Sequence, residues 1–264
     1  MARATPSWLI TDFYVDTDLG VIATGKEGEV GLVERTANDG IRSHLLARKR
    51  YRPRTVTKKG ELQALGFERA PTFRNDIVYR DGRNYGRRSR DRRAVESMTK
   101  YGKELVKERW LGHEYDVMSA AWEAGASVPY PTGYDDDGGL LLEYVGDRTR
   151  AAPRLAQARL DARALRDAWS QLQENLRLVV ESGWVHADLS AYNALWWDER
   201  LWLIDFPQAV DLVQSPHGFD LLHRDVTNIS TWFTKRGVDT DAEAFFAELV
   251  SAAFSGGRSV GPAL

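Results

Sequence analysis

The sequence predicts an α+β fold with two lobes, a small and mostly β N-terminal lobe and a reduced, mostly α C-terminal lobe. Apolar residues alternate as in β-strands near the N-terminus, at 19–23, 29–36 and 43–51. Helical spacing dominates the other end, at 155–182 with a break near Asp161, at 217–235 and at 240–254. The lobes are expected to comprise residues 1–143 and 144–264.

The middle of the chain contains a basic insert, one helix and one buried strand. Residues 53–109 have few apolar side chains and many arginines, which favours a flexible segment, above all at 81–93. Apolar residues then recur at helical spacing over 110–124. After an extended link at 128–131, the run 140–145 predicts a buried strand, and Gly146 would begin the connection between the lobes.

The net charge of −2 hides an uneven distribution. Residues 48–109 hold 20 Lys or Arg and 8 Asp or Glu, a net charge of +12, so the remainder carries −14. A basic insert in an acidic body favours a polyanionic partner such as RNA, or an internal electrostatic contact. The absence of cysteine excludes disulfides and cysteine nucleophiles. No signal peptide or membrane-spanning run is present, so we expect a cytoplasmic protein without a membrane partner.

The segment Gly183–Phe206 organises the rest of the chain. Asp188 is followed five residues later by Asn193, and Asp205 comes after the apolar stretches Ala194–Trp197 and Leu201–Ile204. These stretches predict a hairpin that places Asn193 and Asp205 at adjacent open ends. Phosphoryl transfer needs a carboxylate at the attacking oxygen and oxygen ligands for Mg²⁺, and these three residues supply both. The pattern H-x-D-x-x-x-x-N followed by D-F therefore predicts a protein-kinase-like site.

A glycine turn between the first two strands is a candidate phosphate loop. It consists of Thr24, Gly25, Lys26, Glu27 and Gly28, followed by Val30 in the next strand. Glycine lets backbone N–H groups approach phosphate oxygens closely. An ordinary hairpin turn remains the alternative, since the loop matches neither G-x-G-x-x-G nor the Walker pattern.

Lys49 in the third strand is the candidate for the lysine that contacts the α- and β-phosphates. Arg48 and Arg50 flank it, so the choice depends on a partner. Glu114 in the helix 110–124 is that expected partner, because a Lys–Glu ion pair fixes the lysine for phosphate contact. Backbone groups of Glu143 and Val145 are candidates for hydrogen bonds to an adenine edge.

Four further residues bear on the catalytic segment. We expect His186 to be a structural hydrogen-bonding residue and Asp225 to hydrogen-bond back to the catalytic loop. Pro207 stands where D-F-G would have glycine, and it restricts the backbone after Asp205. Ala187 replaces the arginine of H-R-D. Only about ten residues separate Asp205 from the next helix and no A-P-E follows, so we expect no peptide-binding activation segment.

The chain resembles the RIO family of atypical serine/threonine protein kinases, nearest its RIO1-like branch. The matching stretches include TGKEGEV at Thr24–Val30, LLLEYVG at Leu140–Gly146, WVHADLSAYNALW at Trp184–Trp196 and LIDFPQAV at Leu203–Val210. The resemblance covers roughly residues 19–254.

The resemblance implies a two-lobed kinase fold that binds ATP and Mg²⁺. Lys49 would contact phosphate with Glu114 as its partner, Asp188 would be the catalytic aspartate, and Asn193 and Asp205 would bind the metal. The γ-phosphate would pass to a Ser or Thr hydroxyl of this chain or of an unknown protein substrate, or to water. Asp205 would also be the residue that carries a transient aspartyl-phosphate. Gly28-Glu29 and Pro207 depart from the family pattern.

Two other functions stay open. One is a nucleotide-switched RNA- or ribosome-binding factor with slow turnover, favoured by the arginine-rich insert. The other is a small-molecule kinase of the aminoglycoside or choline type, which shares H-x-D-x-x-x-x-N. The second is disfavoured because only 59 residues follow Asp205, fewer than a helical substrate domain needs.

Overall fold

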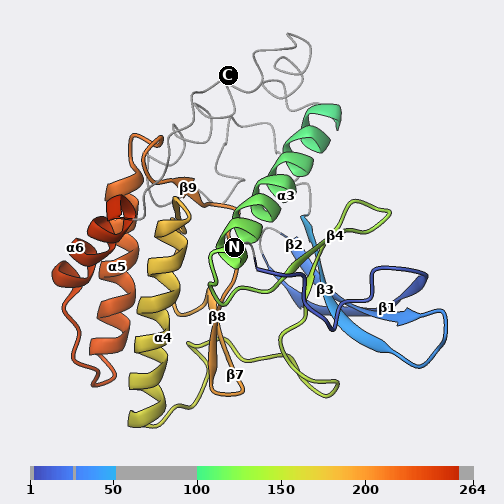
Figure 1. Cartoon of the computed structure of the whole chain (residues 1–264), viewed down its shortest axis with the longest axis horizontal. Coiled ribbons are helices and arrows are strands. Elements are labelled where there is room, and N and C mark those ends of the chain that lie inside the picture. The colour runs from blue at the N-terminus through green and yellow to red at the C-terminus, as the bar shows by residue number, and fades with distance from the viewer. Residues whose placement is uncertain (1–2, 26–27, 52–99, 256–264) are drawn as a thin grey trace, which may run out of the picture. The chain divides into compact units, whose positions relative to one another are not determined.

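The computed structural model describes residues 3–25, 28–51 and 100–255 and divides the chain into two compact units. The sheet unit comprises Thr5–Tyr115 and Pro131–Tyr144, and the helical unit comprises Met1–Ala4, Asp116–Tyr130 and Val145–Leu264. The predicted α+β class, with an antiparallel sheet first and helices later, is confirmed (Figure 1). The units differ from the expected lobes in that Met1–Ala4 and Asp116–Tyr130 belong to the helical unit and Tyr144 belongs to the sheet unit.

Five antiparallel strands in the order β1-β2-β3-β5-β4 form the sheet of the first unit. Their bounds are β1 Tyr14–Thr24, β2 Gly28–Ala37, β3 Ser43–Tyr51, β4 Pro131–Tyr134 and β5 Leu140–Glu143. The third strand has the expected bounds. The first begins at Tyr14 instead of 19, because Tyr14–Asp18 pair with β2 although their side chains are exposed. Local apolar patterning could not detect pairing of this kind.

The two faces of β3 have different surroundings. Leu46 lies on one face with Val33 and Leu141, and all three are buried. Because side chains alternate along a strand, Arg48 and Arg50 follow Leu46 on that face, whereas Lys49 and Tyr51 lie on the other. The sequence thus separates one lysine from its two neighbouring arginines.

Helix α3 spans Lys100–Glu123 and starts ten residues before the predicted Trp110. Residues 100–109 were assigned to the flexible insert, and that part of the prediction is wrong. The first turns of this helix were missed because residues 100–109 are mostly charged and show no strong apolar stripe. The rest of the insert, including 81–93, lies outside the described residues, as do 256–264.

Helix α4 spans Ala162–Glu181 and does not include residues 155–161. Asp161 is the N-cap of α4, because its side chain accepts a hydrogen bond from the N–H of Ala164. The predicted break near Asp161 is therefore the start of the helix. Leu172, Leu176 and Val179 are almost completely buried on its inner face.

Helices α5 (Gly218–Thr234) and α6 (Ala242–Ser255) pack with α4 in the helical unit (Figure 1). Trp169 of α4 is the centre of this packing, since its ring lies 5.1 Å from Phe233 of α5 and 5.5 Å from Phe245 of α6. Burying side chains of this size stabilises a fold by about 1.5–3 kcal/mol each. No helix in the described ranges is long and apolar enough to cross a membrane.

Two short antiparallel strand pairs follow α4 in the sequence. Strands β6 (Trp184–Val185) and β9 (Val210–Asp211) pair with each other, and β7 (Ala194–Trp197) pairs with β8 (Arg200–Leu203). The β7–β8 turn at Asp198 and Glu199 has φ of 50° and 54°, the left-handed values that tight two-residue hairpins require. The predicted hairpin is confirmed, and the two expected metal-binding residues, Asn193 and Asp205, flank it in the sequence.

Candidate active site

The catalytic segment begins where α4 ends. Gly183 follows the C-cap Ser182 with φ of 90°, a left-handed conformation that glycine adopts without strain. Strand β6 then leads into a loop, Ala187–Asn193, and from there into β7. The N–H of Ile204 donates to the carbonyl of Asn193 at 3.0 Å, so the residues just before β7 and just after β8 are held side by side.

Asp188 and Asn193 contact each other directly. The Nδ2 group of Asn193 donates to the backbone carbonyl of Asp188 at 2.8 Å and to its Oδ2 at 3.3 Å. Asn193 is buried, with 8% of its surface exposed. Because its amide nitrogen is used in this way, its Oδ1 is the atom left to bind a cation.

The carboxyl group of Asp188 has a raised pKa. Although the residue is exposed at the surface, neighbouring atoms remove part of the hydration of its carboxyl group, and this desolvation is the main cause. The electrostatic influence of His186 opposes the shift, and that of the Asp205 carboxylate adds to it. The charge of Asp205 thus acts on the carboxyl group of Asp188, and the joint role of these two residues with Asn193 stays a prediction.

Asp205 has a φ of 72°, a conformation that is uncommon outside glycine. Such strain persists only where the surroundings fix it, and it is concentrated at functional sites. The side chain of His186 contributes to that fixation: its Nε2 donates to the carbonyl of Ile204 at 3.0 Å, and its ring packs 4.6 Å from that of Phe206. The structural hydrogen-bonding role predicted for His186 is confirmed.

Asp225 of α5 forms hydrogen bonds with the catalytic loop, as predicted. Its carboxylate accepts hydrogen bonds from the N–H groups of Ala187 at 2.6 Å and Leu189 at 3.2 Å, the residues on either side of Asp188. Asp225 is 1% exposed, and desolvation raises its pKa. Arg224, which the sequence reasoning missed, donates to the carbonyl of Ala187. The backbone on either side of Asp188 is thus held by three hydrogen bonds, in addition to the bond from Asn193 to the carbonyl of Asp188.

In the sheet unit, Lys49 and Glu114 form the predicted ion pair. The Nζ of Lys49 lies 2.5 Å from Oε1 of Glu114, which is completely buried. Tyr51 donates to the other oxygen, Oε2, at 2.8 Å. Tyr51 was not predicted, although its position two residues after Lys49 on the same strand face was a usable signal. The buried carboxylate therefore has a partner at each oxygen.

The glycine turn joins β1 to β2. Thr24 pairs with Glu29, and the N–H of Gly25 donates to the carbonyl of Gly28 at 2.8 Å. Val30 lies opposite Lys49 in the β2–β3 register. Lys26 and Glu27, the other two members of the candidate phosphate loop, lie outside the described residues.

Glu143 and Val145 adjoin the boundary between the two units. Glu143 is the last residue of β5 and pairs with Leu46 in register. The carbonyl of Val145 accepts a hydrogen bond from the N–H of Ala152 at 2.9 Å. The contact of Glu143 and Val145 with an adenine edge stays a prediction.

The donor set of the catalytic segment fits Mg²⁺. Within the described ranges, no three or more His, Asp or Glu side chains form a group that could hold a metal ion unaided. The carboxylate of Asp205 and the amide oxygen of Asn193 suit Mg²⁺, because this ion prefers hard oxygen ligands and completes its coordination shell with water and nucleotide phosphates. These residues would hold Mg²⁺ together with bound nucleotide.

The chain is similar in sequence to proteins of the RIO family. The family model of the RIO domain matches residues 73–245. The RIO-type serine/threonine-protein kinase Rio1 of Thermoplasma acidophilum is 32% identical over 134 residues, which are 51% of this chain and 68% of that protein. The human serine/threonine-protein kinase RIO3 is 39% identical over 100 residues, 38% of this chain and 19% of its own length. The Caenorhabditis elegans serine/threonine-protein kinase RIO1 is 29% identical over 223 residues, 83% of this chain and 37% of its own length.

Proposed function

Since the chain belongs to the RIO family, we propose that it is an ATP- and Mg²⁺-dependent serine/threonine-protein kinase or ATPase. The loop that holds Asp188 beside Asn193, with Asp205 near enough to raise the pKa of Asp188, carries the proposal. The relatives to which the chain is similar are named serine/threonine-protein kinases, which favours a protein acceptor over a small molecule. The acceptor is a Ser or Thr hydroxyl of this chain or of another protein, or water.

Asp188 acts on the acceptor oxygen. Its carboxylate orients the hydroxyl and takes its proton as that oxygen bonds to the γ-phosphorus and ADP leaves. The raised pKa makes Asp188 a better proton acceptor near neutral pH than an ordinary aspartate. Bound Mg²⁺ would neutralise phosphate charge, held by Asn193 Oδ1 and Asp205.

Lys49 holds the α- and β-phosphates in the same proposal. Its ammonium group already lies against Glu114, whose second oxygen is fixed by Tyr51. A lysine positioned by a buried carboxylate loses little freedom when phosphate binds. Asp205 is also the proposed site of a transient aspartyl-phosphate, formed if its carboxylate instead of a hydroxyl attacks the γ-phosphorus.

The test measures transfer of labelled γ-phosphate from Mg·ATP to the protein and to water. Asp188→Asn should reduce turnover by about 10²–10⁴-fold and leave Mg·ATP affinity within about tenfold. Asp198→Asn at the exposed β7–β8 turn is the matched control and should be fully active. Asp205→Ala should weaken Mg·ATP binding and abolish any hydroxylamine-sensitive phosphoenzyme. Full activity of Asp188→Asn would remove this residue from the catalytic role.

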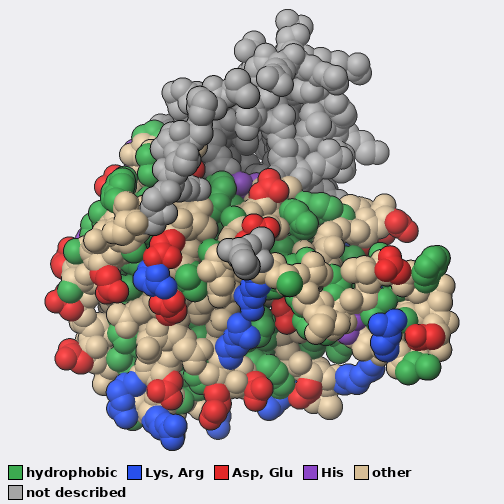
Figure 2. Space-filling view, in the orientation of Figure 1, with side chains coloured by type: hydrophobic (Ala, Val, Ile, Leu, Met, Phe, Trp, Pro, Cys, Tyr) green, Lys and Arg blue, Asp and Glu red, His purple; other side chains and the backbone are tan. Residues whose placement is uncertain are grey.

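A second candidate function is binding of RNA, or of a particle that contains it, controlled by the nucleotide. It rests on the net charge of +12 over residues 48–109, most of which lie outside the described ranges. On the face shown in Figure 2, by contrast, acidic and basic side chains of the described residues are interspersed. A basic field for a polyanion is therefore better sought in the insert than on that face.

Neutralising Arg87, Arg88, Arg92 and Arg93 together tests this candidate. Each phosphate contact on a single strand contributes a log–log salt slope of about −0.7, so losing four contacts should flatten the slope of RNA binding by about 3. ATP turnover should change little. If RNA affinity and its salt slope stay unchanged while thermal stability falls, the arginines balance the acidic body of the same molecule instead.

A further inference from the structure

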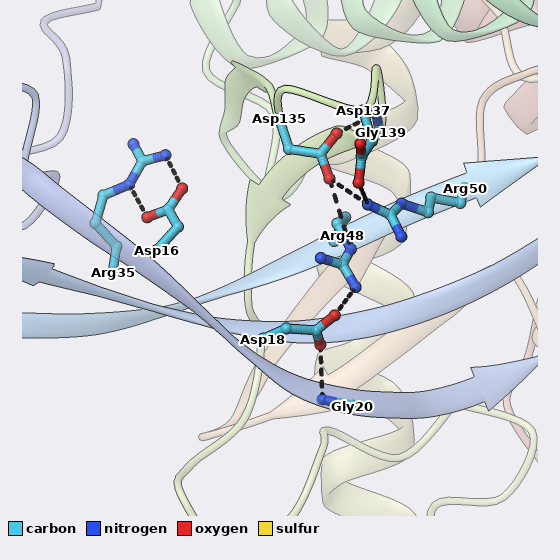
Figure 3. A network of polar contacts seen from close by, with 9 residues as sticks. All are labelled: Asp16, Asp18, Gly20, Arg35, Arg48, Arg50, Asp135, Asp137 and Gly139. Atoms are coloured by element: carbon cyan, nitrogen blue, oxygen red, sulfur yellow. Dashed lines mark hydrogen bonds and ion pairs between the residues drawn. The ribbon is translucent and has the colours of Figure 1, made fainter.

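A network of charged side chains lies on the face of the sheet opposite Lys49 (Figure 3). Arg48 of β3 donates to Oδ2 of Asp18 in β1 at 2.5 Å and lies 3.7 Å from Oδ2 of Asp135 in the β4–β5 turn. Arg50 donates to the same oxygen of Asp135 at 2.9 Å and to Asp137 at 2.6 Å. The network therefore connects the edge strand β1, the central strand β3 and the β4–β5 turn.

Arg48 reaches β1 by passing over β2. In the β2–β3 register Arg48 lies opposite Gly31, and a Cβ atom at Gly31 would lie 3.2 Å from a terminal guanidinium nitrogen of Arg48. The missing side chain at Gly31 leaves space for the guanidinium group. Its path is enclosed, because the Arg48 side chain is only 12% exposed. A long, charged side chain held in this way has lost most of its rotamer freedom, and its contacts are correspondingly specific.

At the far end of this path Asp18 stabilises an irregularity in β1. Its Oδ1 accepts the N–H of Gly20 at 2.8 Å, and the β1–β2 register shifts between these two residues. Gly20 has φ of 98°, a conformation open to glycine and strained for other residues. The hydrogen bond with Arg48 is the main reason that the pKa of Asp18 lies below its ordinary value. Bulges of this kind bend and twist a strand.

The bend has a functional consequence because β1 runs on from Gly20 to Thr24, where the candidate phosphate loop starts. The other end of the turn is also tightly held: a Cβ atom at Gly28 would lie 2.2 Å from the carbonyl oxygen of Arg50. Arg48 thus contacts the bulge from which β1 continues to one side of the turn, and at Gly28 the other side lies directly against the strand that carries Lys49.

We propose that Asp18, Arg48 and Asp135 are positioning residues that fix the end of β1, which leads into the candidate phosphate loop, relative to the strand that carries Lys49. The proposal rests on the proposed function, since it assigns these residues a role in Mg·ATP binding. They do not contact ATP. They act through the β1 bulge and the β4–β5 turn, which they join to the same strand.

The experiment uses the whole chain and compares Arg48→Met and Asp18→Asn with Arg42→Gln. Arg42 forms an exposed ion pair with Asp39 at 3.7 Å in the β2–β3 turn of the same sheet, which makes it a matched control. Hydrogen exchange of residues 14–24 reports the order of β1. Calorimetric titration with Mg·ATP reports affinity, and the denaturation midpoint reports global stability.

Arg48→Met and Asp18→Asn should each accelerate exchange in residues 14–24 and weaken Mg·ATP affinity by up to about fivefold, the upper end of the range for a partly exposed ion pair. The double variant should be little weaker than either single one, because both remove the same contact. Arg48→Lys should restore part of the affinity, and Arg42→Gln should resemble the wild type.

Unchanged exchange in residues 14–24, or a loss of global stability with unchanged Mg·ATP affinity, would overturn the proposal and leave the network as a purely structural one. If the wild-type protein itself does not bind Mg·ATP, the proposed kinase function fails. In that case the exchange data still decide whether the network orders β1, so the two failures are distinguishable.

Discussion

Asp225→Ala is the substitution from which the structure predicts the largest combined effect on stability and catalysis. The carboxylate accepts hydrogen bonds from two backbone N–H groups, those of Ala187 and Leu189, in a site where Asp225 is 1% exposed. A buried donor left without a partner costs about 1–3 kcal/mol. Two such donors give an expected loss of about 2–6 kcal/mol in the free energy of unfolding.

Part of that loss is offset, because the wild-type protein must bury a carboxylate whose pKa is raised by desolvation. Asp225→Asn keeps one acceptor oxygen and should therefore lose less stability than Asp225→Ala. Both variants release the backbone on either side of Asp188, so turnover should fall more than Mg·ATP affinity does. Chemical denaturation measures the first quantity, and steady-state kinetics with ATP titration measures the second.

Asp220→Ala is the control for this prediction. Asp220 lies in the first turn of the same helix, and its side chain is 86% exposed. Its replacement should change the free energy of unfolding by less than about 0.5 kcal/mol, the usual range for surface positions. The reasoning is refuted if Asp225→Ala unfolds at the same denaturant concentration as Asp220→Ala and retains wild-type turnover.

Three other predictions follow from the same structure. Glu114→Gln removes the charge paired with Lys49 and should destabilise the protein by about 1.5–3 kcal/mol, the range for hydrogen bonds to charged groups, and weaken Mg·ATP binding, as denaturation and titration would show. Gly28→Ala places a methyl group 2.2 Å from a backbone oxygen of Arg50, so overpacking should lower stability by about 1–3 kcal/mol, and an unchanged melting temperature would contradict the close contact. Because the pKa of Asp225 is raised in the folded state, its contribution to stability is greatest below the unfolded value of 3.8 and declines as pH rises through the folded pKa. Denaturation curves at several pH values should show a smaller decline in Asp225→Asn than in the wild type, because Asp188, whose pKa is also raised, still contributes in the variant.

Much of the catalytic segment could be predicted from the sequence because its determinants are local. The spacing of Asp188, Asn193 and Asp205 around a short apolar hairpin places two of these residues at adjacent strand ends, whatever packs around them. Strand alternation likewise separates Lys49 from Arg48 and Arg50. The helices of the second half were predictable for the same reason, since their apolar stripes repeat at helical spacing.

Boundaries were less predictable where the apolar pattern was weak or a cap intervened. The start of α3 at Lys100 and the exposed residues Tyr14–Asp18 of β1 carry no strong apolar pattern, and their structure depends on continued backbone hydrogen bonding. The sequence predicted that Asp161 interrupts a helix, whereas in the structure it is the N-cap at which α4 begins.

Contacts between residues distant in the sequence were decided by the tertiary structure. From the sequence alone, Arg48 is expected to be a cation that faces solvent. Only the fold brings Asp18 and Asp135 close to it, and the contact with Asp18 crosses β2 at a glycine. The same holds for the bond from Tyr51 to Glu114 and for the bond from Arg224 to Ala187. Sequence periodicity states which face of an element a residue occupies. Partners 30 or more residues away are chosen by strand order and helix packing, which local patterns do not encode.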